Sequence, residues 1–221
     1  MPGTLTSGIP MLRELDPASL ALVAVSIPAG LLAAFVVRRT ADSPAAGWLP
    51  LVAGCLVVAF MSVMVVPQPW LAAATFALGW MLLMLATIDA LVFRLPDILT
   101  LPLVAAGLLL SWWLPDTPLI AHAVGAAVGF LVFYAIAAIY RSVRGHEGLG
   151  FGDAKLVAAA GAWLGWAALP SMVLIACAAG FVWVGLAVVR RGRAALGEQI
   201  PFGVPLCFAF WIVWLFGPLG V

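Results

Sequence analysis

Long apolar stretches separated by short polar breaks run along the whole chain. We read eight such segments, at residues 20–37, 48–66, 70–89, 98–114, 119–140, 154–169, 171–189 and 202–219. A helix needs about 20 apolar residues to cross a bilayer. In lipid the backbone polar groups find no water, so spans of this kind are helical. The pattern therefore predicts an all-α fold, a polytopic transmembrane helical bundle of about eight helices.

The breaks between segments are rich in proline, which ends or kinks helices. Pro67 to Pro69 separate the second and third segments, and Pro115 to Pro118 separate the fourth and fifth. Pro170 divides the sixth from the seventh, and the sixth is short for a span. These two segments therefore form either two helices or one kinked helix with a re-entrant piece.

Composition supports a membrane location and excludes several other classes. The chain is 66% hydrophobic and 9% charged, with a mean hydropathy of +1.21, whereas soluble domains are about one-quarter charged. The lipid bilayer is thus an expected partner. The net charge is +1 and no basic patch occurs, so no nucleic-acid partner is expected. The three cysteines form no Cys-x-x-Cys pair, and we predict no metal site and no cofactor.

Basic residues are distributed unequally between the two sides of the predicted bundle. With eight alternating crossings, every one of the ten lysines and arginines except Arg13 falls on one side. Loops rich in lysine and arginine face the cytoplasm. The sequence therefore predicts a multi-pass membrane protein in which this side is cytoplasmic.

Two carboxylates lie at the ends of apolar segments on that same side. Asp89 ends the third segment, and Asp153 opens the sixth. A carboxylate inside a span costs about 2.5–3.5 kcal/mol on insertion scales, which favours a functional role. Two close carboxylates can share one proton, so that one activates water and the other polarises a peptide carbonyl. The pair is our candidate for the catalytic residues of a protease.

The neighbours of these acids have both structural and functional interpretations. Gly150 and Gly152 flank Phe151 before Asp153, either as a flexible loop leading to an N-cap or as room for an extended substrate. Asp97 is expected to cap the next helix, with support of the active site as the alternative. Lys155 is expected to anchor the helix at the interface, and balancing a carboxylate is its alternative.

Together these motifs resemble the type IV prepilin peptidase family, the membrane aspartic proteases with a Gly-x-Gly-Asp motif. The resemblance covers roughly residues 70–219 and rests on four pieces in order: Ile88-Asp89 with Arg94-Leu95-Pro96-Asp97, Gly148 to Lys155, Gly161 to Gly165, and Ile200-Pro201-Phe202-Gly203. The resemblance implies an aspartic endopeptidase with Asp89 and Asp153 as its catalytic residues. The resemblance also implies that the protein lies in the inner (cell) membrane of a bacterium. Its substrates would be prepilins or pseudopilins, cut at the cytoplasmic face after a glycine that ends a short basic leader.

The chain departs from many members of that family in one place. Members that also methylate the new N-terminus with S-adenosylmethionine carry a domain with Cys-x-x-Cys motifs between the first two helices. Here that place holds only about ten residues, from Arg38 to Gly47, a length typical of a plain helix connection. We therefore expect peptidase activity without methylation, and transfer of a methyl group to a processed pilin would contradict this. We divide the chain into residues 1–69, a tail with two accessory helices, and residues 70–221, a six-helix peptidase core.

Three other functions share some of these sequence features. A transporter or proton-coupled carrier also uses intramembrane carboxylates, but both acids lie at one interface and no internal repeat is evident. Presenilin-like enzymes and archaeal preflagellin peptidases share Gly-x-Gly-Asp, and the Leu-Pro-Asp and Pro-Phe-Gly pieces argue against the presenilin-like group. A non-catalytic assembly scaffold is disfavoured by the presence of both aspartates.

Overall fold

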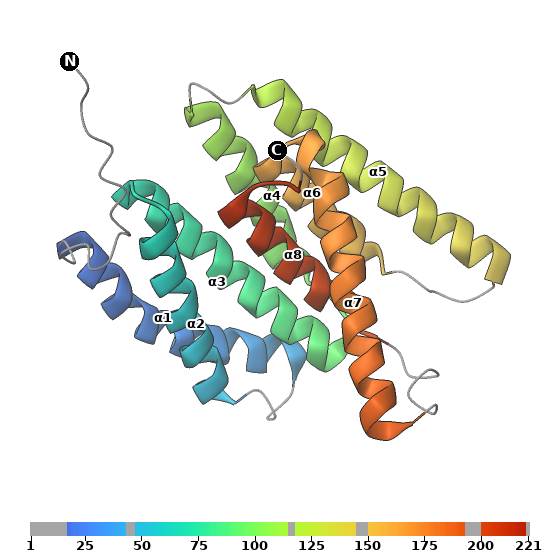
Figure 1. The fold of residues 1–221 in the computed structure, drawn as a ribbon, viewed down its shortest axis with the longest axis horizontal. Coiled ribbons are helices and arrows are strands. Elements are labelled where there is room, and N and C mark those ends of the chain that lie inside the picture. Colours follow the sequence, from blue (N-terminus) through green and yellow to red (C-terminus); the bar gives the residue numbers. More distant parts are fainter. Residues whose placement is uncertain (1–16, 43–46, 115–117, 145–149, 193–199, 220–221) are drawn as a thin grey trace, which may run out of the picture.

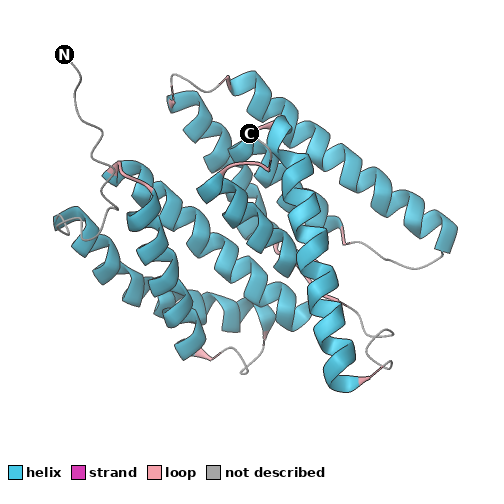
Figure 2. Ribbon diagram, viewed as in Figure 1, coloured by secondary structure: helices cyan, strands magenta, loops and turns pink. Residues whose placement is uncertain are grey.

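The computed structural model describes residues 17–42, 47–114, 118–144, 150–192 and 200–219, and this part of the chain is helical without strands (Figures 1 and 2). The predicted all-α fold of about eight helices is confirmed. The elements are α1 (Pro17–Ala41), α2 (Trp48–Val65), α3 (Pro69–Val92), α4 (Asp97–Trp113), α5 (Leu119–Arg144), α6 (Phe151–Leu164), the 3-10 turn η1 (Trp166–Ala168), α7 (Leu169–Arg191) and α8 (Gly203–Phe216).

The boundary between the sixth and seventh segments follows from local backbone chemistry. Helix α6 ends at Leu164 because Gly165 adopts a φ of +77°, in a region that favours glycine. After η1 the chain starts α7, with Pro170 in the first helical turn, where its missing N–H leaves no hydrogen bond unmade. Two separate helices are thus present, and they do not form one kinked helix.

The helices differ in how they meet the bilayer. Five are long and apolar enough to cross a membrane, namely α1, α2, α3, α5 and the unit of η1 and α7. Helices α4, α6 and α8 have 17, 14 and 14 residues, and a 14-residue helix is only about 21 Å long. The chain is a multi-pass membrane protein, and within the described ranges five of the eight expected crossings have the length and composition of full spans.

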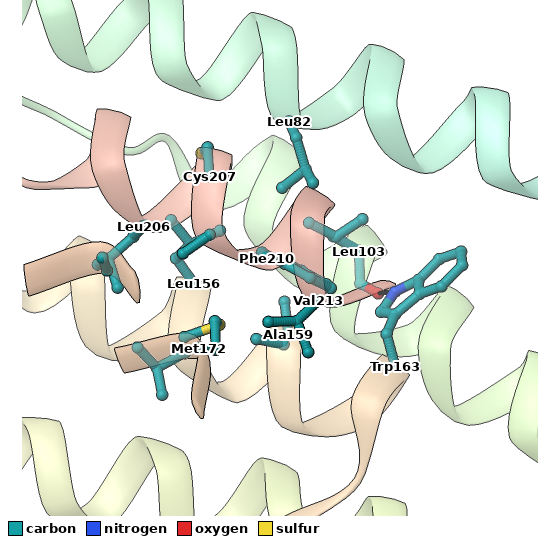
Figure 3. Close-up of a cluster of buried hydrophobic side chains, with 14 of the residues drawn as sticks. Leu82, Leu103, Leu156, Ala159, Trp163, Met172, Leu206, Cys207, Phe210 and Val213 are labelled. Carbon is teal, nitrogen blue, oxygen red and sulfur yellow. Dashed lines mark hydrogen bonds between the residues drawn. The ribbon is translucent and has the colours of Figure 1, made fainter. Parts of the chain in front are cut away.

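The centre of the bundle lies around the short helices α6 and α8. Ten of the 14 residues of α6 are buried, and α8 packs against α3, α6 and α7. Figure 3 shows Phe210 and Val213 of α8 among side chains from α3, α4, α6 and α7. The Trp163 indole N–H donates a hydrogen bond to the Leu103 carbonyl at 2.8 Å, which ties α6 to α4. This packing fixes both short helices, whose first turns belong to the site described below.

Small residues bring α5 and α6 into close contact. A β-carbon on Gly125 would lie 2.7 Å from the carbonyl oxygen of Gly161, and one on Gly129 would lie 3.0 Å from that of Val157. The Gly-x-x-x-Gly spacing of the fifth segment therefore marks a helix–helix contact face, as small residues do in membrane proteins. In this way α5 covers α6 on the side opposite to α8.

Helices α1 and α2 pack on the outer side of α3. Their buried residues contact Met84 and Ile88 of α3 in one cluster and Phe76 in another. The Trp80 indole N–H also donates to the Ala29 carbonyl of α1 at 3.0 Å. The division of the chain near residue 69 into accessory helices and a peptidase core stays a prediction.

Candidate active site

Asp89 lies in the last turn of α3 and is buried, with 5% of its surface exposed. The helix ends three residues later, at Val92. The next residue, Phe93, adopts a left-handed φ of 55°, and its N–H donates to the Asp89 carbonyl at 2.9 Å. The change of backbone direction turns the chain toward α4. Asp89 therefore lies at an end of α3 while its side chain remains inside the bundle.

Asp153 lies in the first turn of α6 and is 7% exposed. Its backbone N–H donates to the Gly150 carbonyl at 3.1 Å, and the Gly150 N–H donates back to the Asp153 Oδ2 at 3.3 Å. Gly150 is thus the N-cap residue, and Asp153 is the third residue of the helix. The expectation of an N-cap aspartate is wrong in position, although the carboxylate does satisfy a backbone amide there. Phe151 and Gly152 are helical, so the flexible-loop interpretation of Gly-Phe-Gly is wrong for these two residues.

The first turn of α8 brings a third element to the site. A β-carbon on Gly203 would lie 2.7 Å from the Asp89 Oδ2 and 2.8 Å from its carboxyl carbon. The backbone amides of Gly203 and Val204 also interact with this carboxylate. The positive end of the α8 dipole is therefore directed at Asp89, in the way that helix N-termini favour anions.

The two carboxylates form one site. Asp153 lies within electrostatic range of Asp89. Asp153 is in the first turn of α6, and the Asp89 carboxylate lies against the first turn of α8. The Asp89 Oδ2 is buried and has no hydrogen-bond partner among the described residues. A buried polar oxygen without a partner is costly unless it holds a proton, a water or a ligand.

This arrangement has a definite chemical capacity. Two neighbouring carboxylates cannot easily both carry charge, so one proton shared between them separates an acid from a base. The α8 N-terminus favours the remaining negative charge, and the unpartnered Oδ2 offers a place for a polarised water. The arrangement suits general acid–base hydrolysis.

The expected supporting residues lie beside this pair, in positions that differ from some expectations. Asp97 is the first residue of α4, and the N-cap position is taken by Pro96, so the predicted capping role of Asp97 is wrong. Its carboxylate instead accepts a hydrogen bond from the Lys155 ammonium group in an ion pair. Lys155 therefore balances a carboxylate, which was the less favoured of its two interpretations.

Sequence reasoning left two residues out of the candidate site. Leu95 is 8% exposed, and a β-carbon on Gly152 would lie 2.8 Å from its Cβ. Gly203 touches Asp89 as described above. The signal for both was present in the Leu-Pro-Asp and Pro-Phe-Gly pieces, but only the fold shows that these pieces meet.

No group of histidine, cysteine and acidic side chains suited to a metal ion occurs within the described ranges. Gly148, in the second motif, lies outside those ranges.

Comparisons with known proteins find one family that the chain matches. Residues 76–185 match the type IV leader peptidase family. The chain is 48% identical over 132 residues to a prepilin leader peptidase/N-methyltransferase of Burkholderia pseudomallei, covering 60% of this chain and 42% of that protein. Proteins of the same name from Aeromonas salmonicida and Aeromonas hydrophila are 40% and 38% identical, over 73% and 81% of this chain and 56% and 62% of theirs.

The chain thus spans about half the length of the curated relatives it matches. No solved structure matches it. The comparisons do not support the transporter alternative.

Proposed function

Because this chain belongs to the type IV leader peptidase family, we propose that it is a membrane-embedded aspartic endopeptidase that cleaves the leader peptides of type IV prepilins or pseudopilins. The observation that carries the proposal is the meeting of two buried carboxylates, Asp89 and Asp153, at the ends of α3 and α6. The names of the relatives supply the substrate class.

In the proposed mechanism the two aspartates share one proton and hold one water between them. The ionised carboxylate removes a proton from this water as it attacks the scissile carbonyl carbon. The protonated carboxyl group donates to the carbonyl oxygen. When the tetrahedral intermediate collapses, the C–N bond breaks and the proton taken from water passes to the leaving amine. As the C=O bond re-forms, the oxygen that had been protonated returns its proton to the other carboxylate, which restores the starting pair. The mechanism is the same whichever of the two aspartates is the base and whichever is the acid.

We further propose that the site faces the cytoplasm, at the inner membrane of a bacterium. The support is the distribution of basic residues: Arg38 and Arg39 end α1, and Arg190 and Arg191 end α7. Arg94 lies two residues after the end of α3, the helix end that carries Asp89. By the positive-inside rule this end of the bundle is cytoplasmic.

The activity is tested by incubating the purified chain with a prepilin in liposomes and determining the N-terminus of the product. The expected product begins at the residue after the glycine that ends the leader. We expect no methyl group on that residue, even with S-adenosylmethionine present. An intact prepilin after long incubation, with the enzyme still folded, would reject the proposed function.

Orientation is tested with single cysteines introduced at Arg190 and at Gln68, on opposite sides of the predicted bundle. A membrane-impermeant maleimide added to spheroplasts is expected to label Gln68→Cys and to reach Arg190→Cys only after lysis. The unmodified chain is the control for Cys55, Cys177 and Cys207. The opposite pattern of labelling would place the site outside the cytoplasm.

A further inference from the structure

The short connector between α3 and α4, residues 93–96, touches both helices whose first turns form the site. It begins with Phe93 in the left-handed conformation, which costs a residue other than glycine about 1–2 kcal/mol. Backbone conformations of this kind persist where surrounding contacts hold them. Two contacts hold this connector against the neighbouring helices.

Leu95 provides the first contact. Its side chain packs against Gly152 in α6, since a β-carbon there would lie 2.8 Å from the Leu95 Cβ and 3.3 Å from its backbone nitrogen. It also reaches α8, because a β-carbon on Gly203 would lie 3.2 Å from the Leu95 Cδ1. Leu95 therefore fills the space between the first turns of α6 and α8. Gly152 directly precedes Asp153, and Gly203 contacts Asp89.

The ion pair of Asp97 with Lys155 provides the second contact. It joins the first residue of α4 to α6, two residues after Asp153. The side chains are 59% and 29% exposed. Pairs this exposed contribute about 0–1 kcal/mol to stability, so the pair is a weak explanation for the overall fold. Its position suggests a local role, because it fixes the start of α6 against the connector.

We propose that Leu95, Asp97 and Lys155 form a brace that sets the position of Asp153 relative to Asp89. The three are positioning residues, which act through the aspartates and do not touch the substrate. The proposal rests on the proposed function, because the distance between the carboxylates matters only if they share a proton. In enzymes a misplacement of about 1 Å can lower the rate by about 100-fold. A brace that contributes little to the free energy of unfolding can therefore have a large effect on catalysis.

The test is a double-mutant cycle on prepilin cleavage with Asp97→Asn, Lys155→Met and the double variant. Each single change is expected to lower kcat about tenfold with KM nearly unchanged, because the rate of the chemical step is sensitive to the relative positions of the reacting groups. The double variant is expected to be no slower than either single one, because the pair acts as a unit. Asp97→Glu and Lys155→Arg keep the charges and are expected to retain most of kcat. Leu95→Ala is expected to lower kcat in the same way.

Asp42→Asn is the matched control, an acid-to-amide change at the end of α1, and it is expected to leave kcat unchanged. Three results would each overturn the brace. They are an unchanged kcat in the single variants, effects that multiply in the double variant, and a change confined to KM. Hydrogen exchange gives a readout that needs no cleavage: residues 93–97 and the first turn of α6 are expected to exchange faster in Asp97→Asn than in the unmodified chain. If the unmodified chain does not cleave prepilin, the proposed function fails while exchange still decides the brace.

Discussion

Replacing either Asp89 or Asp153 with asparagine is expected to abolish prepilin cleavage. The expected fall in kcat is about 100- to 10,000-fold or more, because general acid–base catalysis contributes a factor in this range. Asparagine keeps the shape of aspartate but cannot take up and release the proton. Because the two groups act as a unit, the double variant is expected to be no slower than either single one. The measurement is the initial rate of leader removal in liposomes.

The same variants are expected to remain folded. Both carboxylates are buried, and the Asp89 Oδ2 has no hydrogen-bond partner among the described residues. A neutral amide removes the cost of placing charge in a low-dielectric interior, so the melting temperature followed by circular dichroism is expected to stay the same or rise. Cleavage by both folded variants at the rate of the unmodified chain would remove the aspartates from the mechanism.

Elements of the fold were predictable from sequence where one strong signal determined the structure. Runs of about 20 apolar residues give helices in lipid because a helix satisfies its backbone hydrogen bonds within the segment itself. The eight segments therefore match helices, with ends shifted by a few residues. The two acids were also identifiable, since carboxylates at the ends of apolar runs are expensive and stand out.

Features that depend on the meeting of distant segments were not predictable. Asp97 lies just before an apolar run, a position typical of an N-cap. Its carboxylate instead forms an ion pair with Lys155, which is 58 residues away in sequence. Gly203 was visible as part of a motif, but its contact with Asp89 depends on the packing of α8 against α3. Local propensity has no access to such contacts, which tertiary structure alone creates.

Replacing Gly203 with alanine is expected to give the second large loss of activity, a fall in kcat of about 10- to 100-fold. The added β-carbon would lie 2.7 Å from the Asp89 Oδ2 and 2.8 Å from its carboxyl carbon, closer than van der Waals contact allows. The added β-carbon has little room to move away from Asp89, because it would also lie 3.2 Å from the Leu95 Cδ1. Asp89 or the first turn of α8 must shift, and a shift of a fraction of an ångström in a reacting group is enough for this loss.

This loss is expected to come without a matching loss of stability, which separates it from general misfolding. Gly203 is helical and its φ is not positive, so alanine suits the backbone and has a helix propensity better by about 1 kcal/mol. Gly185 is the matched control, since it also lies within a helix and a β-carbon there would meet nothing within 4 Å. Gly185→Ala is expected to keep full activity. If Gly203→Ala cleaves prepilin as fast as Gly185→Ala, then α8 does not hold Asp89 in its working position, and the site consists of α3 and α6 alone.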